Sequence, residues 1–201
     1  MSAQSVSTYR LSLLVLAVGV VWVSSDVLRA QEDGFFPNTK KLGQAAVEYR
    51  DDAIHVVAAY YYSQRNHDSR WMLIETAMST TRDMVIDRDD IKLVTPEGRD
   101  VFLPTQARFA QEVSRVRPVL QNASTTRHGV LNYFSQRSWS ERMRLFALPG
   151  GTVLTNFVTD ADHVARGDLF FESPTGLWTP GTYTLVIERD GARAAVPIEL
   201  E

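Results

Sequence analysis

Hydrophobic and polar residues alternate most regularly near the carboxyl end of the chain. Tyr183, Leu185 and Ile187 fall on one side of an extended backbone, and Thr182 and Thr184 fall on the other. This period of two predicts a β-strand, because successive side chains of a strand point to opposite faces. The apolar side of such a strand must be buried against another layer.

A hairpin turn and a second strand are predicted directly after this first strand. Asp190-Gly191 is a two-residue turn signal, because glycine readily adopts the positive φ that tight hairpins need. Residues 192–200 then return as the partner strand, and Pro197 predicts that this strand lies at a sheet edge. A terminal hairpin needs a second sheet to cover its apolar face, so the preceding chain is expected to supply one.

Short apolar stretches separated by turns predict further strands in the preceding chain. These strands are expected at residues 45–49, 53–62, 71–81, 84–86, 91–94, 100–103, 152–159 and 168–171. A helix is an alternative for residues 53–62, because Ala58 and Ala59 interrupt the alternation. Eight or so short strands with turns between them are typical of a β-sandwich.

One helix is predicted within this series of strands, over residues 105–117. Phe109, Val113 and Val116 lie at i, i+4 and i+7 and form an apolar stripe. Pro118 is expected to end the helix, because proline has no N–H group for the helical hydrogen bond. The chain is therefore expected to be mainly β, an antiparallel β-sandwich with one helical insertion.

An uncharged hydrophobic segment follows Arg10 and spans residues 11–23. This pattern indicates a signal peptide or a membrane anchor that forms a hydrophobic helix. A helix of this length spans only ~20 Å of a ~30 Å hydrocarbon core, which favours a signal peptide, whereas Trp22 suits an anchor. Both alternatives stay open. The predicted division is a signal peptide or membrane anchor over residues 1–30, a linker and possible first strand over residues 31–52, and the sandwich over residues 53–201.

Both alternatives place the carboxyl-terminal domain across a membrane. Arginine outnumbers lysine by 18 to 3, a bias typical of GC-rich bacterial coding sequences. The expected location is therefore the periplasmic side of the bacterial inner membrane, with the domain anchored there or secreted into the periplasm. Nucleic acid is not an expected partner in that compartment.

The residue types present exclude several kinds of chemistry. Cysteine is absent, which excludes disulfides, iron–sulfur clusters, thiolate zinc sites and a cysteine nucleophile. The sequence contains neither a Gly-x-Ser-x-Gly nucleophile elbow nor a phosphate-binding glycine loop. The histidines show no metal-ligand spacing; they are His55, His67, His128 and His163. We therefore expect a protein that is not an enzyme and has no catalytic residue, metal site or cofactor.

Positive charge is concentrated between Arg108 and Arg144. This stretch holds seven arginines and two glutamates, a net charge of +5, whereas the whole chain has −3. One interpretation is a solvated insertion whose arginines pair with the acidic remainder of the domain. The other is a contact surface for a protein partner or for anionic lipid, because arginine and aromatic residues are enriched at interfaces. The residues expected on that surface are Arg108, Arg115, Arg117, Arg127, Tyr133, Phe134, Arg137, Trp139, Arg142 and Arg144.

The run PGTYTLVI, residues 180–187, resembles the late strands of immunoglobulin-like domains in bacterial cell-envelope proteins. This resemblance implies an immunoglobulin-like sandwich, in which Tyr183 would form a tyrosine corner with its hydroxyl bonded to nearby backbone. The cysteine pair and the core tryptophan of antibody-type domains are missing, so no binding site follows from the resemblance.

Two functions remain as hypotheses. The first is a non-enzymatic interaction domain, exported or membrane-anchored, that serves as an accessory or structural subunit of a cell-envelope or membrane complex, for example an electron-transfer or photosynthetic one. The second is a periplasmic domain that binds or hydrolyses a small molecule, glycan or peptide at a site around His128, Asp162 and His163. Convergence of these three side chains in one pocket would favour the second.

Overall fold

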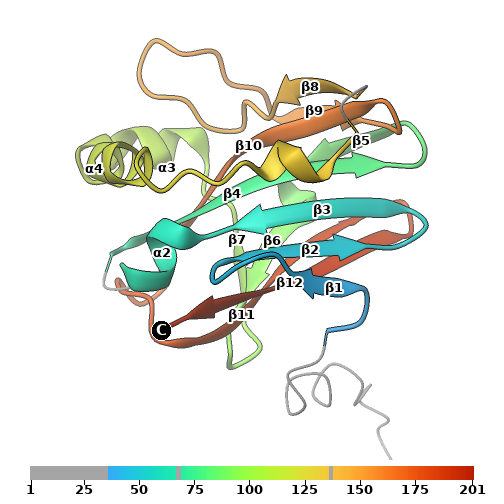
Figure 1. The fold of residues 1–201 in the computed structure, drawn as a ribbon. Helices are drawn as coiled ribbons and strands as arrows, with labels where there is room; N and C mark the ends of the chain where they lie inside the picture. Colours follow the sequence, from blue (N-terminus) through green and yellow to red (C-terminus); the bar gives the residue numbers. More distant parts are fainter. Residues whose placement is uncertain (1–35, 67–68, 136–137) are drawn as a thin grey trace, which may run out of the picture. The chain divides into compact units, whose positions relative to one another are not determined.

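The computed structural model describes residues 36–66, 69–135 and 138–201. The predictions for residues 1–30 and for residues 31–35 of the expected linker lie outside them. Residues 36–201 form one unit, in which strands make up most of the regular structure (Figure 1). In the described part of the chain, no helix is long and apolar enough to cross a bilayer.

The larger sheet has six strands in the described residues, in the order β1-β2-β3-β4-β10-β8. Their bounds are Thr39–Lys41 for β1, Ala46–Arg50 for β2, Ile54–Ala59 for β3, Trp71–Thr80 for β4, His163–Glu172 for β10 and Trp139–Arg142 for β8. Neighbouring strands are antiparallel except β8, which runs parallel to β10. The prediction of a purely antiparallel sandwich is therefore wrong at this one pair, because β8 enters the sheet edge from the helical region rather than through a hairpin.

The smaller sheet contains the terminal hairpin, in the order β12-β11-β6-β7. The bounds are Ala192–Leu200 for β12, Gly181–Arg189 for β11, Ile91–Val94 for β6 and Asp100–Phe102 for β7. Asp190 and Gly191 turn the hairpin with φ of 48° and 81°, as a two-residue turn requires. Pro197 lies on β12 at the edge of this sheet, which confirms the edge prediction.

A short third pair completes the strands of the described residues. β5, Met84–Asp87, pairs with β9, Asn156–Thr159, and a 3₁₀ turn, η1 at Arg88–Asp90, links β5 to β6. Ile86 and Phe157 of this pair join the same buried cluster as the two larger sheets. The sheets thus enclose a common apolar core, as the sandwich prediction expected.

Tyr183 of β11 lies in that core and is 3 % exposed. Its hydroxyl donates a hydrogen bond to the backbone oxygen of Thr179 at 3.0 Å and accepts one from the Thr179 N–H at 3.3 Å. Its ring meets Trp178 edge-on, with ring centroids 5.4 Å apart. The prediction that Tyr183 is buried with a bonded hydroxyl is confirmed.

The structure has two helices where the sequence predicted one, over residues 105–117. α3, Gln106–Gln111, and α4, Val113–Ala123, are separate helices that meet at Glu112, and Pro118 lies inside α4. Pro118 does not end α4 because its ring is exposed to solvent, while Val116, Val119 and Ala123 on the other side are buried. The packing of that buried side outweighs the one lost hydrogen bond.

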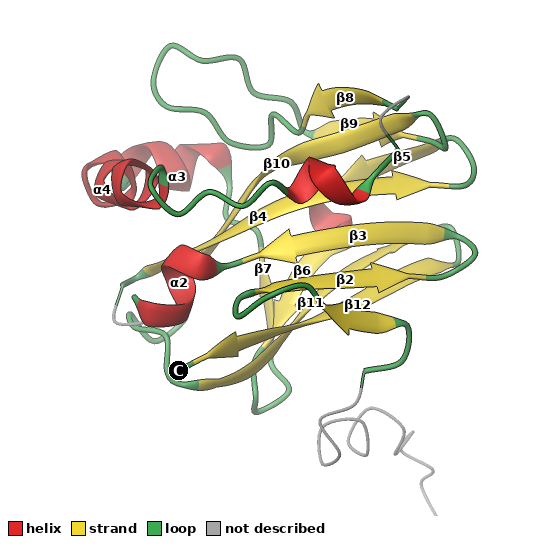
Figure 2. Cartoon of the chain, viewed as in Figure 1, coloured by secondary structure: helices red, strands yellow, loops and turns green. Residues whose placement is uncertain are grey.

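α3 and α4 cover part of the outer face of the larger sheet, the face turned away from the smaller sheet (Figure 2). Phe109 of α3 and the buried side of α4 pack there on Trp71, Leu73 and Phe170. A 3₁₀ turn, η2 at Val130–Tyr133, covers a neighbouring part of that face, near Val57 and Val164.

Three strand predictions need new limits. The strand predicted over residues 152–159 begins only at Asn156, as β9. The strand predicted over residues 53–62 ends at Ala59, and α2, Tyr61–Arg65, takes up its last residues. The strand interpretation is thus correct for Ile54–Ala59, and the helical one holds only for Tyr61 and Tyr62. The strand predicted at residues 168–171 is the inner part of the longer β10, because the polar residues before it continue the alternation.

Candidate functional site

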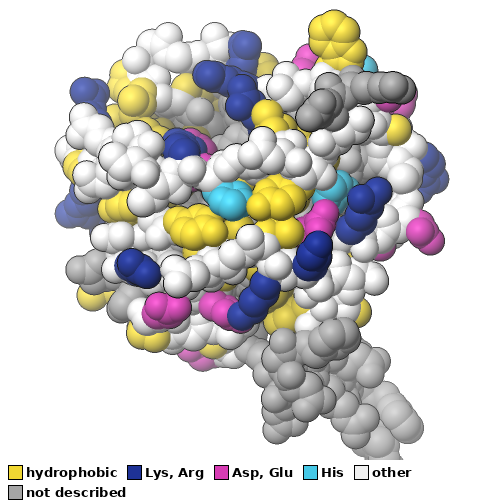
Figure 3. Space-filling model, viewed as in Figure 1, with side chains coloured by type: hydrophobic (Ala, Val, Ile, Leu, Met, Phe, Trp, Pro, Cys, Tyr) yellow, Lys and Arg dark blue, Asp and Glu magenta, His cyan; other side chains and the backbone are white. Residues whose placement is uncertain are grey.

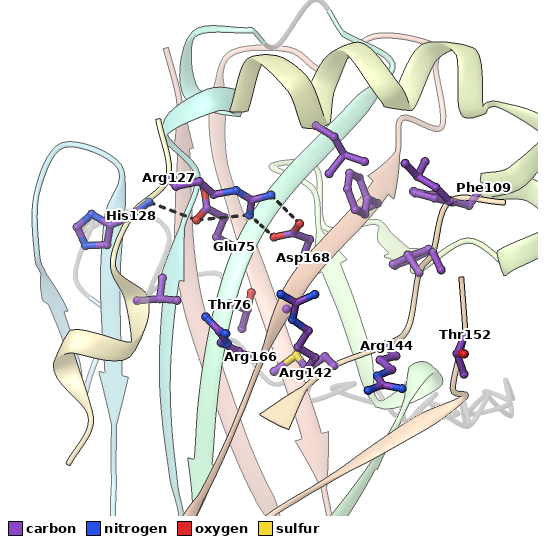
Figure 4. A pocket seen from close by; sticks show the side chains of 18 residues that line it. Glu75, Thr76, Phe109, Arg127, His128, Arg142, Arg144, Thr152, Arg166 and Asp168 are labelled. Atoms are coloured by element: carbon purple, nitrogen blue, oxygen red, sulfur yellow. Dashed lines mark hydrogen bonds and ion pairs between the residues drawn. The ribbon is translucent and has the colours of Figure 1, made fainter. Parts of the chain in front are cut away.

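An open cavity of about 780 Å³ lies on the outer face of the larger sheet. Its floor comes from β4 and β10, one wall from the end of α4 and residues 127–130, and the other wall from residues 142–152. Figure 3 shows a hollow in this region with Lys and Arg side chains around it, and Figure 4 shows the side chains that line it. The cavity therefore combines elements that are far apart in the sequence.

At one end of the cavity, an arginine pairs with two carboxylates. Glu75 on β4 and Asp168 on β10 lie opposite each other in the register of the two strands. Arg127 forms two hydrogen bonds with the Asp168 carboxylate, one of them at 2.8 Å between Nη2 and Oδ2. Its Nη1 also lies 3.6 Å from Glu75 Oε2, so one guanidinium serves two carboxylates.

Glu75 is the most perturbed of these groups. Burial raises the pKa of the Glu75 carboxyl to about 7, although the charge of Arg127 opposes this shift. Glu75 Oε2 also accepts the backbone N–H of His128 at 3.2 Å. Burial lowers the pKa of His128, which favours its neutral form. The charge of this end of the cavity therefore changes by about one unit around neutral pH.

At the other end of the cavity lie three arginines that have no carboxylate partner among the described residues. Arg142, Arg144 and Arg166 are exposed, and among the described residues no carboxylate lies within ion-pair distance of any of them. Arg142 and Arg166 are partners in the β8–β10 register, so their side chains leave the sheet on the same face. Figure 4 shows all three on the same side of the Arg127–Asp168 pair. Adjacent like charges repel each other, and an anion between them would relieve that repulsion.

Specific contacts hold the wall that carries Arg144. Arg88 lies over the Phe146 ring at 4.6 Å and donates hydrogen bonds to the backbone oxygens of Leu145 and Pro104. The backbone oxygen of Arg144 itself accepts the Leu154 N–H at 2.7 Å. The backbone on both sides of the Arg144 side chain is therefore fixed before any ligand binds.

Gly167 lets this wall approach the sheet. A Cβ atom at Gly167 would lie 2.7 Å from Met143 Cβ and 2.9 Å from the Met143 oxygen. A larger residue there would push Met143, and with it the arginines on either side, away from β10. The absence of a side chain at position 167 thus contributes to the shape of the cavity.

Aromatic side chains form the apolar wall beside α3 and α4. Phe109 lies 4.9 Å from Phe146 and 5.0 Å from Phe170, measured between ring centroids. Phe109 and Phe170 are buried and support Phe146, the partly exposed ring of the three, which gives a ligand an apolar surface next to charged groups. Polar groups that converge beside an apolar wall are typical of a binding site.

The structure divides the arginines predicted for the interaction surface. Arg108 pairs with Glu172 and Glu112, Arg115 pairs with Glu112, and Arg127 pairs with Asp168 and Glu75. Arg117, Arg142 and Arg144 have no ion pair among the residues described, and Arg137 lies outside them. Both interpretations of the basic stretch are therefore represented, each by different arginines.

The three aromatic residues predicted for that surface also differ from one another. Phe134 stacks on His55 with ring centroids 4.2 Å apart, and Tyr133 stacks on His128 and bonds to it at 3.1 Å. Trp139 on β8 is 74 % exposed. Of the three, Trp139 is the one most available to a partner.

The residues proposed for a catalytic or small-molecule site do not converge. His128 lines the cavity, but Asp162 and His163 do not. His163 lies five residues before Asp168 on β10, which corresponds to roughly 17 Å along a strand. Its Nδ1 lies 2.7 Å from Asp160 Oδ2 in the adjacent turn. The described residues also contain no group of three acidic or histidine side chains placed to hold a metal ion.

Three important residues of the site were missed by the sequence reasoning: Glu75, Arg166 and Asp168. They lie outside the arginine-rich stretch, within segments that the sequence predicts as strands or leaves unassigned. The alternation of β10 contains a signal, because Val164, Arg166, Asp168 and Phe170 all point to the outer face. A charged pair inside a row of otherwise apolar positions indicates a polar site on a covered sheet face.

Comparisons with protein-family models, with curated proteins and with solved structures find no match. The fold and the site define the class: a β-sandwich with a basic cavity on the outer face of one sheet.

Proposed function

We propose that this protein is a non-enzymatic interaction domain that binds an acidic segment of a partner protein at the arginine end of the cavity. The observation that carries the proposal is the set Arg142, Arg144 and Arg166, which lacks carboxylate partners among the described residues, although the same sheet face pairs Arg127 completely. Arginine binds carboxylates through two parallel hydrogen bonds, so three free guanidinium groups can hold several acidic side chains.

The wider role follows from the sequence. The hydrophobic amino-terminal segment supports export to the periplasmic side of the inner membrane, with the domain anchored or released there. The domain would then be an accessory or structural subunit of an envelope or membrane complex, with the immunoglobulin-like form of the sandwich that the PGTYTLVI run resembles. Its partner is a protein rather than nucleic acid.

The test is purification of the full chain from its native host, followed by mass spectrometry of the proteins that co-purify. The triple variant Arg142→Glu, Arg144→Glu and Arg166→Glu should lose the partner and keep the melting temperature of the wild type. A matched control reverses Arg50, Arg65 and Arg82, which are also exposed and have no ion pair among the described residues. Retention of the same partner by the first variant would overturn the proposal.

A second candidate is binding of a small anionic ligand, such as a carboxylated metabolite, an acidic glycan or a short peptide. The cavity volume of about 780 Å³ favours it, because it lies in the range of small-molecule sites. His128 would remain part of that site, whereas Asp162 and His163 would not. Calorimetric titration with dicarboxylates and phosphate monoesters tests this candidate, and saturable binding that needs Arg127 as well as Arg142 would support it.

A further inference from the structure

β8 lies at an open edge of the larger sheet. In the part of the chain that the structure describes, β10 is the strand that pairs with it, and its other side has no partner strand. All four residues of β8 are exposed. Edge strands carry unpaired N–H and C=O groups, and natural proteins usually cover or shorten them to prevent association.

The backbone bonds of β8 show which groups are free. The N–H groups of Trp139 and Met143 donate to the backbone oxygens of Asp162 and Arg166, each at 2.7 Å. Because hydrogen-bonding direction alternates along a strand, the N–H and C=O groups of Ser140 and Arg142 point to the open side. Further along, the Arg144 oxygen is already occupied by Leu154, so the open stretch is limited to β8.

The two faces of β8 differ in chemistry. Ser140 and Arg142 are opposite Val164 and Arg166 in the parallel register, so they share the face that carries the cavity. Trp139 and Glu141 point to the other face, where Trp139 is 74 % exposed. A strand added beside β8 would place alternate residues on these two faces.

We propose that the acidic segment of the partner binds in extended form as an added strand on β8. This inference rests on the proposed function and specifies how the partner is recognised. Side chains on the cavity face are acidic, because they meet Arg142 and, behind it, Arg166. Side chains on the opposite face are apolar, because they meet Trp139 and because Glu141 repels further carboxylates there. The recognised pattern is therefore alternation of acidic and apolar residues.

Charge decides between this partner and a second copy of the chain. Pairing of β8 with another β8 would bring the Arg142 side chains of both copies onto neighbouring positions, where like charges oppose each other. An acidic strand removes that repulsion and adds backbone hydrogen bonds and the exposed indole of Trp139. Strand addition of this kind gives affinity through the main chain and specificity through alternate side chains.

The experiment titrates the full chain with a synthetic peptide of alternating glutamate and valine. Ser140→Pro removes one outward N–H group of β8 and should weaken binding at least tenfold, because proline is tolerated at a sheet edge but cannot donate. The matched control Ser140→Ala keeps the backbone and should bind like the wild type. A peptide of alternating lysine and valine should not bind.

A second measurement does not depend on how well the Ser140→Pro variant folds. N-methylation of the peptide at alternate residues removes its own donors, and one of the two possible sets should abolish binding to the wild-type protein. Strand addition is wrong if the Ser140→Pro protein binds the unmodified peptide as tightly as the wild type does, and if both methylated peptides bind the wild type as tightly as the unmodified peptide. The charge contact stands in that case if reversal of Arg142, Arg144 and Arg166 abolishes binding. If the partner identified in cells needs none of these arginines, the proposed function itself fails.

Discussion

Arg127 at one end of the cavity is bound to two carboxylates, whereas Arg142, Arg144 and Arg166 at the other end have no acidic neighbour among the described residues. Both ends lie on the same sheet face, and both are supplied partly by β10. Arg127 is exposed like the other three arginines, so the difference is in the neighbouring carboxylates: Glu75, which is 7 % exposed, lies beside Arg127, and no carboxylate of the described residues pairs with the other three. A buried carboxylate requires a partner, and an exposed guanidinium does not.

This comparison separates stability from recognition. Arg127 offsets two carboxylates that the fold places on a covered sheet face, so its loss affects the folded state. The three free arginines form no ion pair in the described residues, so their loss should affect an incoming partner much more than the fold. Charge that contributes nothing to the fold but is held by a fixed backbone is what a recognition surface needs.

The largest expected effect follows from removing the paired arginine. Arg127→Ala leaves Glu75 and Asp168 next to each other without a counter-charge, and we expect a loss of about 2–4 kcal/mol in the free energy of unfolding. The value is below that of a fully buried pair because the Arg127 side chain is 39 % exposed. Urea denaturation at pH 8 measures it. A loss under about 0.5 kcal/mol would show that this end of the cavity is as loosely held as the other.

Tyr183 offers a reference point away from the cavity, in the core between the two larger sheets. Tyr183→Phe removes the hydroxyl that bonds to both the N–H and the oxygen of the Thr179 backbone, in the loop before β11. We expect a loss of about 1–3 kcal/mol. Thermal denaturation checks it, with Tyr62→Phe on α2 as a control. An unchanged stability would mean that water replaces the hydroxyl.

The third effect is a dependence of the free energy of unfolding on pH, which arises from Glu75 at the Arg127 end of the cavity. The raised pKa of Glu75 means that the folded protein holds this proton to higher pH than the unfolded chain does. Stability therefore falls as pH rises from the ordinary value of 4.5 to about 7, and stays lower above that. We expect Glu75 to contribute a fall of about 1–2 kcal/mol, since water at the cavity mouth relieves part of the burial cost.

Glu75→Gln should remove this contribution, and the difference between the two denaturation series isolates it from other titrating groups. Parallel curves for variant and wild type across the range would show that folding does not raise the pKa of Glu75.

The smallest effect on stability is expected from removing an unpaired arginine. Arg142→Ala should change the free energy of unfolding by less than about 0.5 kcal/mol, because the side chain is exposed and has no ion pair in the described residues. The same denaturation series as for Arg127→Ala measures it. A loss near that of Arg127→Ala would place Arg142 among the structural arginines.

Local patterns predicted some parts of this molecule well. The terminal hairpin follows from the alternation around Tyr183, the turn at Asp190-Gly191 and the edge position of Pro197, all of which are set by neighbouring residues. The end of the helix did not follow, because the packing of α4 outweighs the local effect of Pro118. Local signals thus predict an element well when no tertiary contact opposes them.

The site was predictable only in part, because strand pairing assembles it. The concentration of arginine between residues 108 and 144 correctly drew attention to Arg142 and Arg144, but it gave equal weight to Arg108, which is bound internally. No residue near Arg166 in the sequence indicates that Arg142 of β8 will lie beside it. Whether an arginine is paired depends on residues distant in sequence, such as Glu172 for Arg108, and composition does not contain that information.

The most direct test of the central claim is arginine-selective dicarbonyl labelling of the full chain, alone and in its native complex, with each site quantified by mass spectrometry. Alone, Arg142, Arg144 and Arg166 should react readily and Arg127 slowly. In the complex, the first three should become protected, while Arg50 and Arg82 remain reactive as internal controls. Protection of other arginines, with the three cavity arginines unchanged, would contradict the account.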